Sequence, residues 1–197
     1  MTLKKKQWLL ILTVGFMSAP VFAAEKKAAM SPEMMQKWAA YSTPSEGHKA
    51  LEPLVGSWSH TMKFWMAPDS KPEISTGTTE SKWILGGRFV EAMVTGTSMG
   101  QPFEGRGISG FDNEKKQYTS IWIDNMATGM MISNGTYDTA SKKLTENGTA
   151  SCPFEGTKNF RGVTKITDNN THTYEMYGPA PDGKEFKMME IKYTRNK

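Results

Sequence analysis

The side chains that could carry metal or acid–base chemistry are few in this sequence and stand far apart. The histidines are His48, His60 and His172, and Cys152 is the single cysteine. The sequence contains no His-Glu-x-x-His motif, no Cys-x-x-Cys pair and no Gly-x-Ser-x-Gly nucleophile elbow. We therefore predict no catalytic residue and no metal site, and an enzymatic function is not favoured.

His60 is the histidine whose predicted position best suits ligand or metal binding. His60 lies two residues after Trp58 on one predicted strand. Because side chains alternate between the two faces of a strand, both point to the same face. If that face is the interior, His60 could be the axial ligand of a haem. Lone histidines usually have structural roles, so haem stays an alternative and no cofactor is predicted. His172 follows a turn and is expected to be solvent-exposed, whereas His48 could cap a short helix.

Methionine and aromatic side chains are the second group with possible chemistry. The sequence has 15 methionines and 6 tryptophans, and thioethers adapt to irregular partners. Adjacent pairs such as Met130 and Met131 point to opposite faces of a strand, which argues against copper(I) chelation by a pair. Since pockets combine apolar walls with a few polar groups, we predict a small hydrophobic or amphipathic ligand. Its candidate contacts are Trp58, Trp83, Met93, Trp122, Met130, Tyr177 and Met188.

The sequence allows two registers for the last predicted strand, and they turn opposite faces of it inward. In the first, Arg195 meets Trp58 inside the molecule and Glu190 faces water. The lumen residues of this register are Met189, Ile191 and Tyr193. In the second register Glu190 points inward, and its neighbours are Trp122, Asp124 and Glu175. Because acids are seldom fully buried, Trp122 and Met188 are favoured over any acid as lumen residues.

The elements that must position these side chains are strands. From Leu54 onward the chain is rich in β-branched and aromatic residues, and clusters of Gly, Pro, Asn and Asp interrupt it at short intervals. The predicted strands are 54–66, 74–85, 88–98, 103–112, 117–125, 129–138, 143–150, 158–167, 171–178 and 185–195. Short breaks predict that consecutive strands pair as hairpins.

An antiparallel meander of this length favours closure, since closure removes unpaired edges. We predict an all-β fold, an antiparallel up-and-down β-barrel of eight to ten strands, over 54–197. Ser31-Pro32-Glu33 is typical of a helix start, so a short helix is expected from Pro32 to about Tyr41. Its stripe of Met34, Met35, Trp38 and Tyr41 is expected to pack on the barrel body or to act as a lid.

Gly56 and Trp58 open the first strand, and Arg195 ends the last. An inward Trp58 would plug the barrel end, Gly56 would allow the preceding segment to cross close by, and Arg195 could lie over the indole. These three residues are the predicted closure of the barrel. A Gly-x-Trp at the first strand with an arginine at the last resembles the calycin superfamily of lipocalin-like barrels.

A longer resemblance covers almost the whole chain after the N-terminal segment. The motifs WILGGRF, PFEGRG, WID and KMMEI occur in order at matching intervals. The chain therefore resembles the DUF1579 family, a group of bacterial proteins of unknown function. The resemblance implies a calycin-like barrel and supplies no catalytic residue.

The N-terminal residues are typical of a secretory signal peptide. Lys4, Lys5 and Lys6 precede an apolar run over 8–17, and Val21-Phe22-Ala23 provides small residues for cleavage. We expect residues 1–23 to be removed, 24–53 to form a leader with the short helix, and the protein to be exported to a periplasm. No stable membrane anchor is predicted, because the apolar run is short.

Charge argues against a nucleic-acid partner. The formal net charge of the whole sequence is +4, but residues 1–23 contribute three lysines and no acids, which leaves 21 basic and 20 acidic residues. Such a balance gives no electrostatic footprint for nucleic acid. Besides the ligand carrier, a structural or interaction module with a filled barrel remains an alternative, and oligomeric state is not predicted.

Overall fold

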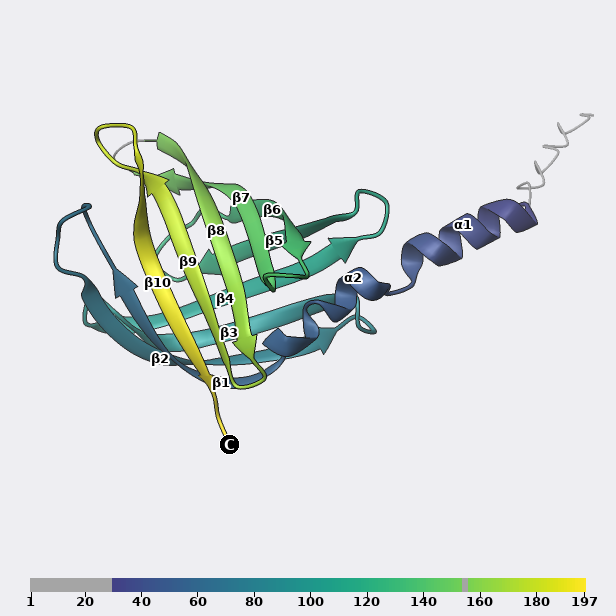
Figure 1. Cartoon of the computed structure of the whole chain (residues 1–197), viewed down its shortest axis with the longest axis horizontal. Coiled ribbons are helices and arrows are strands. Elements are labelled where there is room, and N and C mark those ends of the chain that lie inside the picture. The colour runs from purple at the N-terminus through teal and green to yellow at the C-terminus, as the bar shows by residue number, and fades with distance from the viewer. Residues whose placement is uncertain (1–29, 154–155) are drawn as a thin grey trace, which may run out of the picture.

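A computed structural model describes residues 30–153 and 156–197, which form a closed barrel of ten antiparallel strands (Figure 1). The helical elements are α1 (Pro32–Ser42), α2 (Glu46–Lys49) and the 3-10 helix η1 (Glu52–Leu54). The strands are β1 (Gly56–Phe64), β2 (Glu73–Ile84), β3 (Phe89–Ser98), β4 (Gln101–Asp112), β5 (Gln117–Asp124), β6 (Met131–Asp138), β7 (Lys143–Cys152), β8 (Gly156–Asp168), β9 (Thr171–Pro179) and β10 (Glu185–Arg195). The predicted barrel is confirmed.

The register of β1 and β10 closes the barrel and decides which face is inside. Trp58 pairs with Arg195, and His60 pairs with Tyr193. Trp58 is 1% exposed, so residues that share its alternation point inward. The inward residues of β10 therefore include Met189, Ile191 and Tyr193, as in the first of the two predicted registers. Glu190 lies on the outer face.

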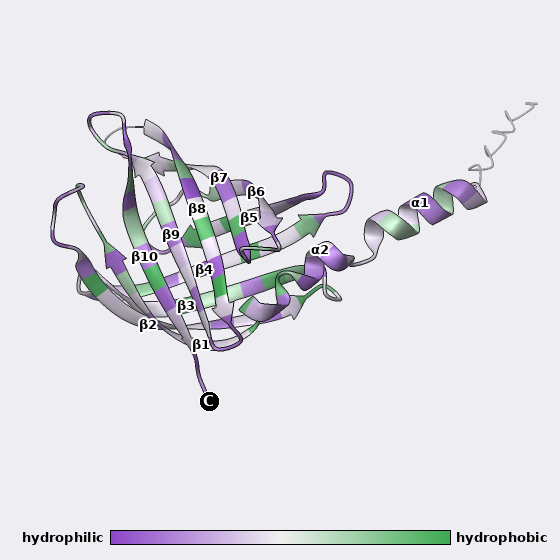
Figure 2. Cartoon of the chain, viewed as in Figure 1, coloured by the Kyte–Doolittle hydropathy of each residue, from purple (hydrophilic) through white to green (hydrophobic). Residues whose placement is uncertain are grey.

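Glycines on the inner face allow large side chains to lie flat against the wall. A Cβ on Gly105 would overlap the indole of Trp122, and a Cβ on Gly148 would overlap the ring of Phe160. A Cβ on Gly162 would likewise come too close to the phenol of Tyr174. Hydrophobic and hydrophilic residues alternate along the strands, for example along β8 (Figure 2). The wall is thus lined by aromatic rings without forcing neighbouring strands apart.

One end of the barrel is plugged by the segment that contains α2 and η1. Leu51, 1% exposed, packs with Val90, Tyr118 and Leu144. The partly buried residues packed around this cluster are Ala50, Leu54, Val55, Trp83, Phe111 and Tyr137. His48 caps α2, since its Nδ1 accepts the backbone N–H of Ser45 at 2.9 Å. The best-buried apolar residues thus gather at this closed end.

Gly56, Trp58 and Arg195 meet at the closed end. The Arg195 guanidinium lies 4.0 Å from the centre of the Trp58 ring, and it donates to the carbonyls of Val55 (2.8 Å) and Pro53 (3.2 Å). Gly56 has a φ of +134°, and a Cβ there would overlap the guanidinium. Glycine is needed for a positive φ and for space beside Arg195, rather than for the passage of the preceding segment.

Helix α1 begins as predicted but does not pack on the barrel. Ser31 caps it by accepting the backbone N–H of Met34. The helix projects away from the barrel (Figure 1), and none of its residues is buried. The expected packing of its apolar stripe on the body is therefore wrong. Among the described residues, no helix is both long and apolar enough to cross a membrane. The predicted signal peptide, residues 1–23, lies outside the described residues.

Candidate ligand-binding site in the barrel lumen

Polar side chains from neighbouring strands form an arc on the inner wall just above the plug. Ser109 on β4 and Ser120 on β5 are hydrogen-bonded at 2.8 Å. Ser133 on β6 donates to a carboxylate oxygen of Glu146 on β7 at 3.3 Å, and Ser120 also bonds to this carboxylate. Tyr174 on β9 lies across Gly162, the β8 residue paired with Glu146. We call these five residues, Ser109, Ser120, Ser133, Glu146 and Tyr174, the polar arc.

Glu146 is the acidic member of the polar arc and is only 7% exposed. Burial raises the pKa of its carboxyl group, and the hydrogen bonds from Ser120 and Ser133 oppose that change in part. Burial, with a further effect of a negative charge on Glu146, also raises the pKa of Tyr174. Both groups are therefore biased towards their protonated forms, in which each can donate a hydrogen bond into the lumen.

Replacing Glu146 with glutamine is expected to change how stability depends on pH. A carboxyl group with a raised folded-state pKa destabilises the fold as it ionises, so the penalty grows as the pH rises above the reference value of 4.5. Glu146→Gln removes that penalty. In urea titrations, the free energy of unfolding of the variant should rise relative to wild type with increasing pH. A difference that does not change with pH would contradict this, and Glu114→Gln in the exposed β4–β5 turn is the control.

The lumen around the polar arc is apolar and partly accessible. Trp122 points inward over Gly105 and Gly107, its Nε1 donates to Asp124 at 2.7 Å, and Phe103 stacks on it at 6.3 Å between ring centres. Trp122 is only half-buried although it points into a closed barrel. The same holds for Met62, Met131, Met176 and Ile191. Since side chains do not seal these inward surfaces, the lumen has room beside them.

His60 and His172 both point inward, near Tyr193. The Nδ1 of His60 lies 3.0 Å from the hydroxyl of Thr79, and its Nε2 faces the backbone of Gly77, where a Cβ would lie 2.7 Å away. The Nδ1 of His60 is thus engaged with Thr79, and its Nε2 lies close against Gly77. The expectation that His172 is solvent-exposed is wrong: it is 7% exposed, stacked on Tyr193 at 4.2 Å between ring centres.

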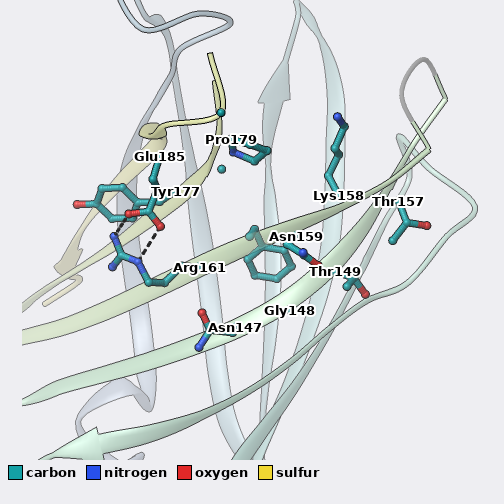
Figure 3. A pocket seen from close by; sticks show the side chains of 13 residues that line it. Asn147, Gly148, Thr149, Thr157, Lys158, Asn159, Arg161, Tyr177, Pro179 and Glu185 are labelled. Atoms are coloured by element: carbon teal, nitrogen blue, oxygen red, sulfur yellow. Dashed lines mark hydrogen bonds and ion pairs between the residues drawn. The ribbon is translucent and has the colours of Figure 1, made fainter. Parts of the chain in front are cut away.

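A pocket of about 660 Å³ lies at the barrel wall between β8 and β9, and Figure 3 shows the side chains that line it. The pairing of these strands begins only at Arg161 and Tyr177, so residues 156–160 pair with β7 alone. Pro179 explains the break. Ala180 donates its N–H to the carbonyl of Lys184, on the β10 side. Because the N–H groups of successive strand residues point to opposite sides, the nitrogen of Pro179 points towards β8. Proline has no N–H there to donate to β8.

The pocket reaches both faces of the wall. Gly148, Phe160 and Gly178 line it from inward positions, and Arg161 and Tyr177 line it from outward positions. Two charge-assisted hydrogen bonds close its outer edge: Arg161 donates to the two carboxylate oxygens of Glu185 at 2.9 and 2.6 Å. The guanidinium also lies 4.1 Å from the centre of the Tyr177 ring (Figure 3). The pocket therefore lies where the pairing of β8 with β9 ends.

The structure separates the predicted ligand contacts into four places. Trp122 and Met188 point inward, Met188 at a bulge of β10 against Gly178. Trp58, which is buried, and Trp83, which is partly buried, belong to the plugged end. Met93 and Tyr177 point outward, because Met93 pairs with Arg106 and Tyr177 with Arg161 in outward registers. Met130 lies in the β5–β6 loop and is 63% exposed. The predicted lumen positions of Met93, Tyr177 and Met130 are therefore wrong.

Of the acidic residues considered for the lumen, one points inward and two point outward. Asp124 shares the inward face of Trp122. Glu175 and Glu190 lie outside, where both accept hydrogen bonds from Lys187. Sequence reasoning missed Glu146, although Leu144 two residues before it is an inward apolar residue on the same predicted strand. Alternation from Leu144 is the signal that could have found it.

Comparison with solved structures agrees with this architecture. The crystal structure of Rv2717c from M. tuberculosis is 15% identical, covers 79% of this chain and 100% of its own, and superposes with a TM-score of 0.58. A redesigned β-barrel, mFAP1, bound to DFHBI is 19% identical over 74% of this chain and 98% of its own, with a TM-score of 0.41. At 15% identity the likeness to Rv2717c shows the fold alone. No curated protein shows significant sequence similarity.

Fold and site together define a closed ten-stranded antiparallel barrel with one plugged end and a polar arc in its lumen. The model of the DUF1579 family, described as protein of unknown function, matches residues 43–195. The chain belongs to this family, as its motifs predicted. The matched region begins after α1, so the family model covers the plug and all ten strands.

Proposed function

We propose that the protein binds a small amphipathic molecule in the barrel lumen. One observation carries the proposal: inward apolar residues such as Trp122 and Met176 are left partly accessible beside the polar arc. Apolar walls with a few fixed polar groups are the usual composition of a ligand site. A ten-stranded barrel is also wider than the eight-stranded barrels that side chains can fill.

The polar arc favours a ligand with an uncharged hydrogen-bonding head. Its hydroxyl groups can both donate and accept, and protonated Glu146 can do the same. On β4 to β7, the described inward positions carry no lysine or arginine. An anionic head would therefore meet no opposite charge and would lie next to Glu146. An alcohol, amide or ketone on an apolar body fits this wall better than a carboxylate.

The two alternatives have weaker support. For haem, the Nδ1 of His60 lies at hydrogen-bond distance from Thr79, and its Nε2 has little space beside Gly77. For an interaction module with a filled barrel, the lumen would need to be packed, but Met62, Met131 and Ile191 are only half-buried there. Ligand carriage therefore remains the function that the geometry supports best.

Trp122 provides the test of lumen binding. N-phenyl-1-naphthylamine, an uncharged apolar probe, is expected to quench tryptophan fluorescence by energy transfer and to gain emission itself. Trp122→Phe should remove most of the saturable part of the quenching. Trp38→Phe, on the exposed helix, should leave the saturable quenching unchanged. Decanol should displace the probe at a concentration at least about tenfold lower than decanoate, a difference of about 1.4 kcal/mol. No saturable probe binding would refute the carrier function.

We also propose that the protein is exported, on the basis of the charged, apolar and small-residue pattern of residues 1–23. The mature chain should then begin at or near Ala24. N-terminal sequencing of the protein from its native cell tests this, and a retained Met1 would contradict it.

A further inference from the structure

Helix α1 carries an apolar stripe that the rest of the described chain leaves uncovered. Met34, Trp38 and Tyr41 follow at i, i+4 and i+7, and Met35 adjoins Trp38 at i+3. Their exposed fractions are 50% to 61%. A helix of 11 residues gains little stability from propensity alone, so a stripe of this size needs a partner surface.

A second uncovered apolar surface lies on the outside of the barrel near the base of α1. Ile108, Ile121 and Ile132 are direct partners in the registers of β4, β5 and β6, so they form a row across three strands. Ile123 extends the row along β5, and Phe89 lies beside it over Gly110. We call these five residues the isoleucine row. Outward positions of an antiparallel sheet are normally polar, and contiguous exposed apolar patches mark interaction sites.

A groove of about 520 Å³ borders the isoleucine row. Phe89, Ile108 and Ile121 line it from the strands, and Tyr41 lines it from the end of α1. The rest of α1 lies beyond the groove and points away from the barrel (Figure 1). The helix therefore reaches the groove of its own chain only with its last turn.

Asn113 fixes this outward direction. Its side-chain amide donates to the carbonyls of Ala40, Tyr41 and Thr43 at 3.1, 3.0 and 2.8 Å. Its carbonyl oxygen accepts the hydroxyl of Ser45 at 2.6 Å. These bonds satisfy the free carbonyls at the helix end and tie them to the β4–β5 turn. Bending α1 back onto its own isoleucine row would break the bonds to Ala40 and Tyr41 within the helix, so the stripe is presented to another molecule.

We infer that this other molecule is a second copy of the chain, and that the α1 stripe of each copy covers the isoleucine row of the other. Both halves of the interface are present on one chain, so a two-fold axis satisfies both at once and closes the assembly as a dimer. Charge does not oppose this pairing: on α1 Glu33 pairs with Lys37 at 2.8 Å, and Arg88 and Lys115 border the groove. The carboxylate of Asp112, also in the groove, is occupied by the amides of the β4–β5 turn.

The size of the two surfaces suits a stable dimer. Seven of their side chains are 38% to 61% exposed: Met34, Met35, Trp38, Tyr41, Phe89, Ile123 and Ile132. At roughly 100 Å² each, half of what a large side chain can bury, they offer on the order of 700 Å² per copy. A standard interface uses about 800 Å² per partner.

The mass of the purified protein in solution tests the dimer. Light scattering after size exclusion should give twice the chain mass. Trp38→Glu and Ile121→Glu should each give the monomer mass with an unchanged far-ultraviolet circular dichroism spectrum, because both side chains lie outside the barrel. Lys165→Glu, an exposed outward substitution on β8, is the control and should remain dimeric. A monomeric wild type would overturn the inference.

A mixing experiment separates mutual exchange from simpler dimers. When the Trp38→Glu and Ile121→Glu chains are mixed, one of the two contacts in a heterodimer has both an intact stripe and an intact row. Native mass spectrometry should then show more heterodimer than either homodimer. If only one of the two substitutions dissociates the dimer, or if no heterodimer forms, the stripes or the sheets pair by themselves and the exchange is refuted.

Discussion

Replacing Trp58 with alanine is expected to lower the free energy of unfolding by about 3 to 5 kcal/mol, the usual cost of truncating a buried tryptophan. The indole is 1% exposed, and its Nε1 donates to the carbonyl of Leu54 at 3.0 Å. Arg195 covers one side at 4.0 Å, and His172 meets it edge-on at 4.4 Å between ring centres. Alanine removes all of these contacts at the junction of β1 and β10.

Urea unfolding monitored by circular dichroism measures this loss. Trp65→Ala is the matched control, because Trp65 lies just beyond the other end of β1, is half-buried and has Lys187 5.8 Å from its ring centre. Its loss should be less than half that of Trp58→Ala. Equal losses would mean that Trp58 does not hold the closed end together. Arg195→Lys should also destabilise the chain, since lysine cannot reproduce the guanidinium's bonds to Val55 and Pro53.

The ten strands could be predicted from sequence because the signals that define them are local. Turn clusters such as Asp112-Asn113-Glu114 and Pro181-Asp182-Gly183 end strands by their own backbone preferences, and β5 and β10 begin at the predicted residues. The start of α1 was equally local, with Ser31 as the cap and Pro32 in the first turn. Where α1 lies in space depends on Asn113, far along the chain, and its apolar stripe alone could not show this.

Which face a strand turns inward depended on contacts between distant strands. For β10 the sequence left two registers open, and the pairing of Trp58 with Arg195 in the structure selects the first of them. In β9, Tyr174 and Tyr177 are both plausible lumen residues by type, and only the pairing of Tyr177 with Arg161 places it outside. A bulge between Lys187 and Met189 also shifts the alternation of β10. Alternation within one strand carries no information on such shifts.

The polar arc was the least predictable part of the site. Acids are rarely buried, so Glu146 was not weighed as a lumen residue. Its burial is possible because Ser120 and Ser133, from two other strands, bond to its carboxyl group. Serines in strands have no distinctive pattern, and only the register of β4 to β7 brings these residues together.

Acidification is expected to destabilise the protein through His172. Burial, with a further effect of the Arg195 charge, lowers the pKa of His172 from 6.5 to about 4. Below pH 6.5 the unfolded chain binds a proton that the folded chain resists, so the stability due to neutral His172 is complete above that pH and declines towards pH 4. At pH 4.5 the loss amounts to roughly 2 to 3 kcal/mol.

His172→Phe isolates this contribution, because phenylalanine keeps a flat ring between Trp58 and Tyr193 but cannot be protonated. It also removes the buried Nδ1, which has no hydrogen-bond partner in the described part of the chain. In urea titrations the variant should be within about 1 kcal/mol of wild type at pH 7.5 and more stable than wild type by a further 2 to 3 kcal/mol, roughly, at pH 4.5. Glu146 acts in the opposite direction over this range, but both chains contain it, so its effect cancels in the difference. If the two chains lose stability in parallel, His172 is protonated in the folded state and its ring is not sealed against Trp58.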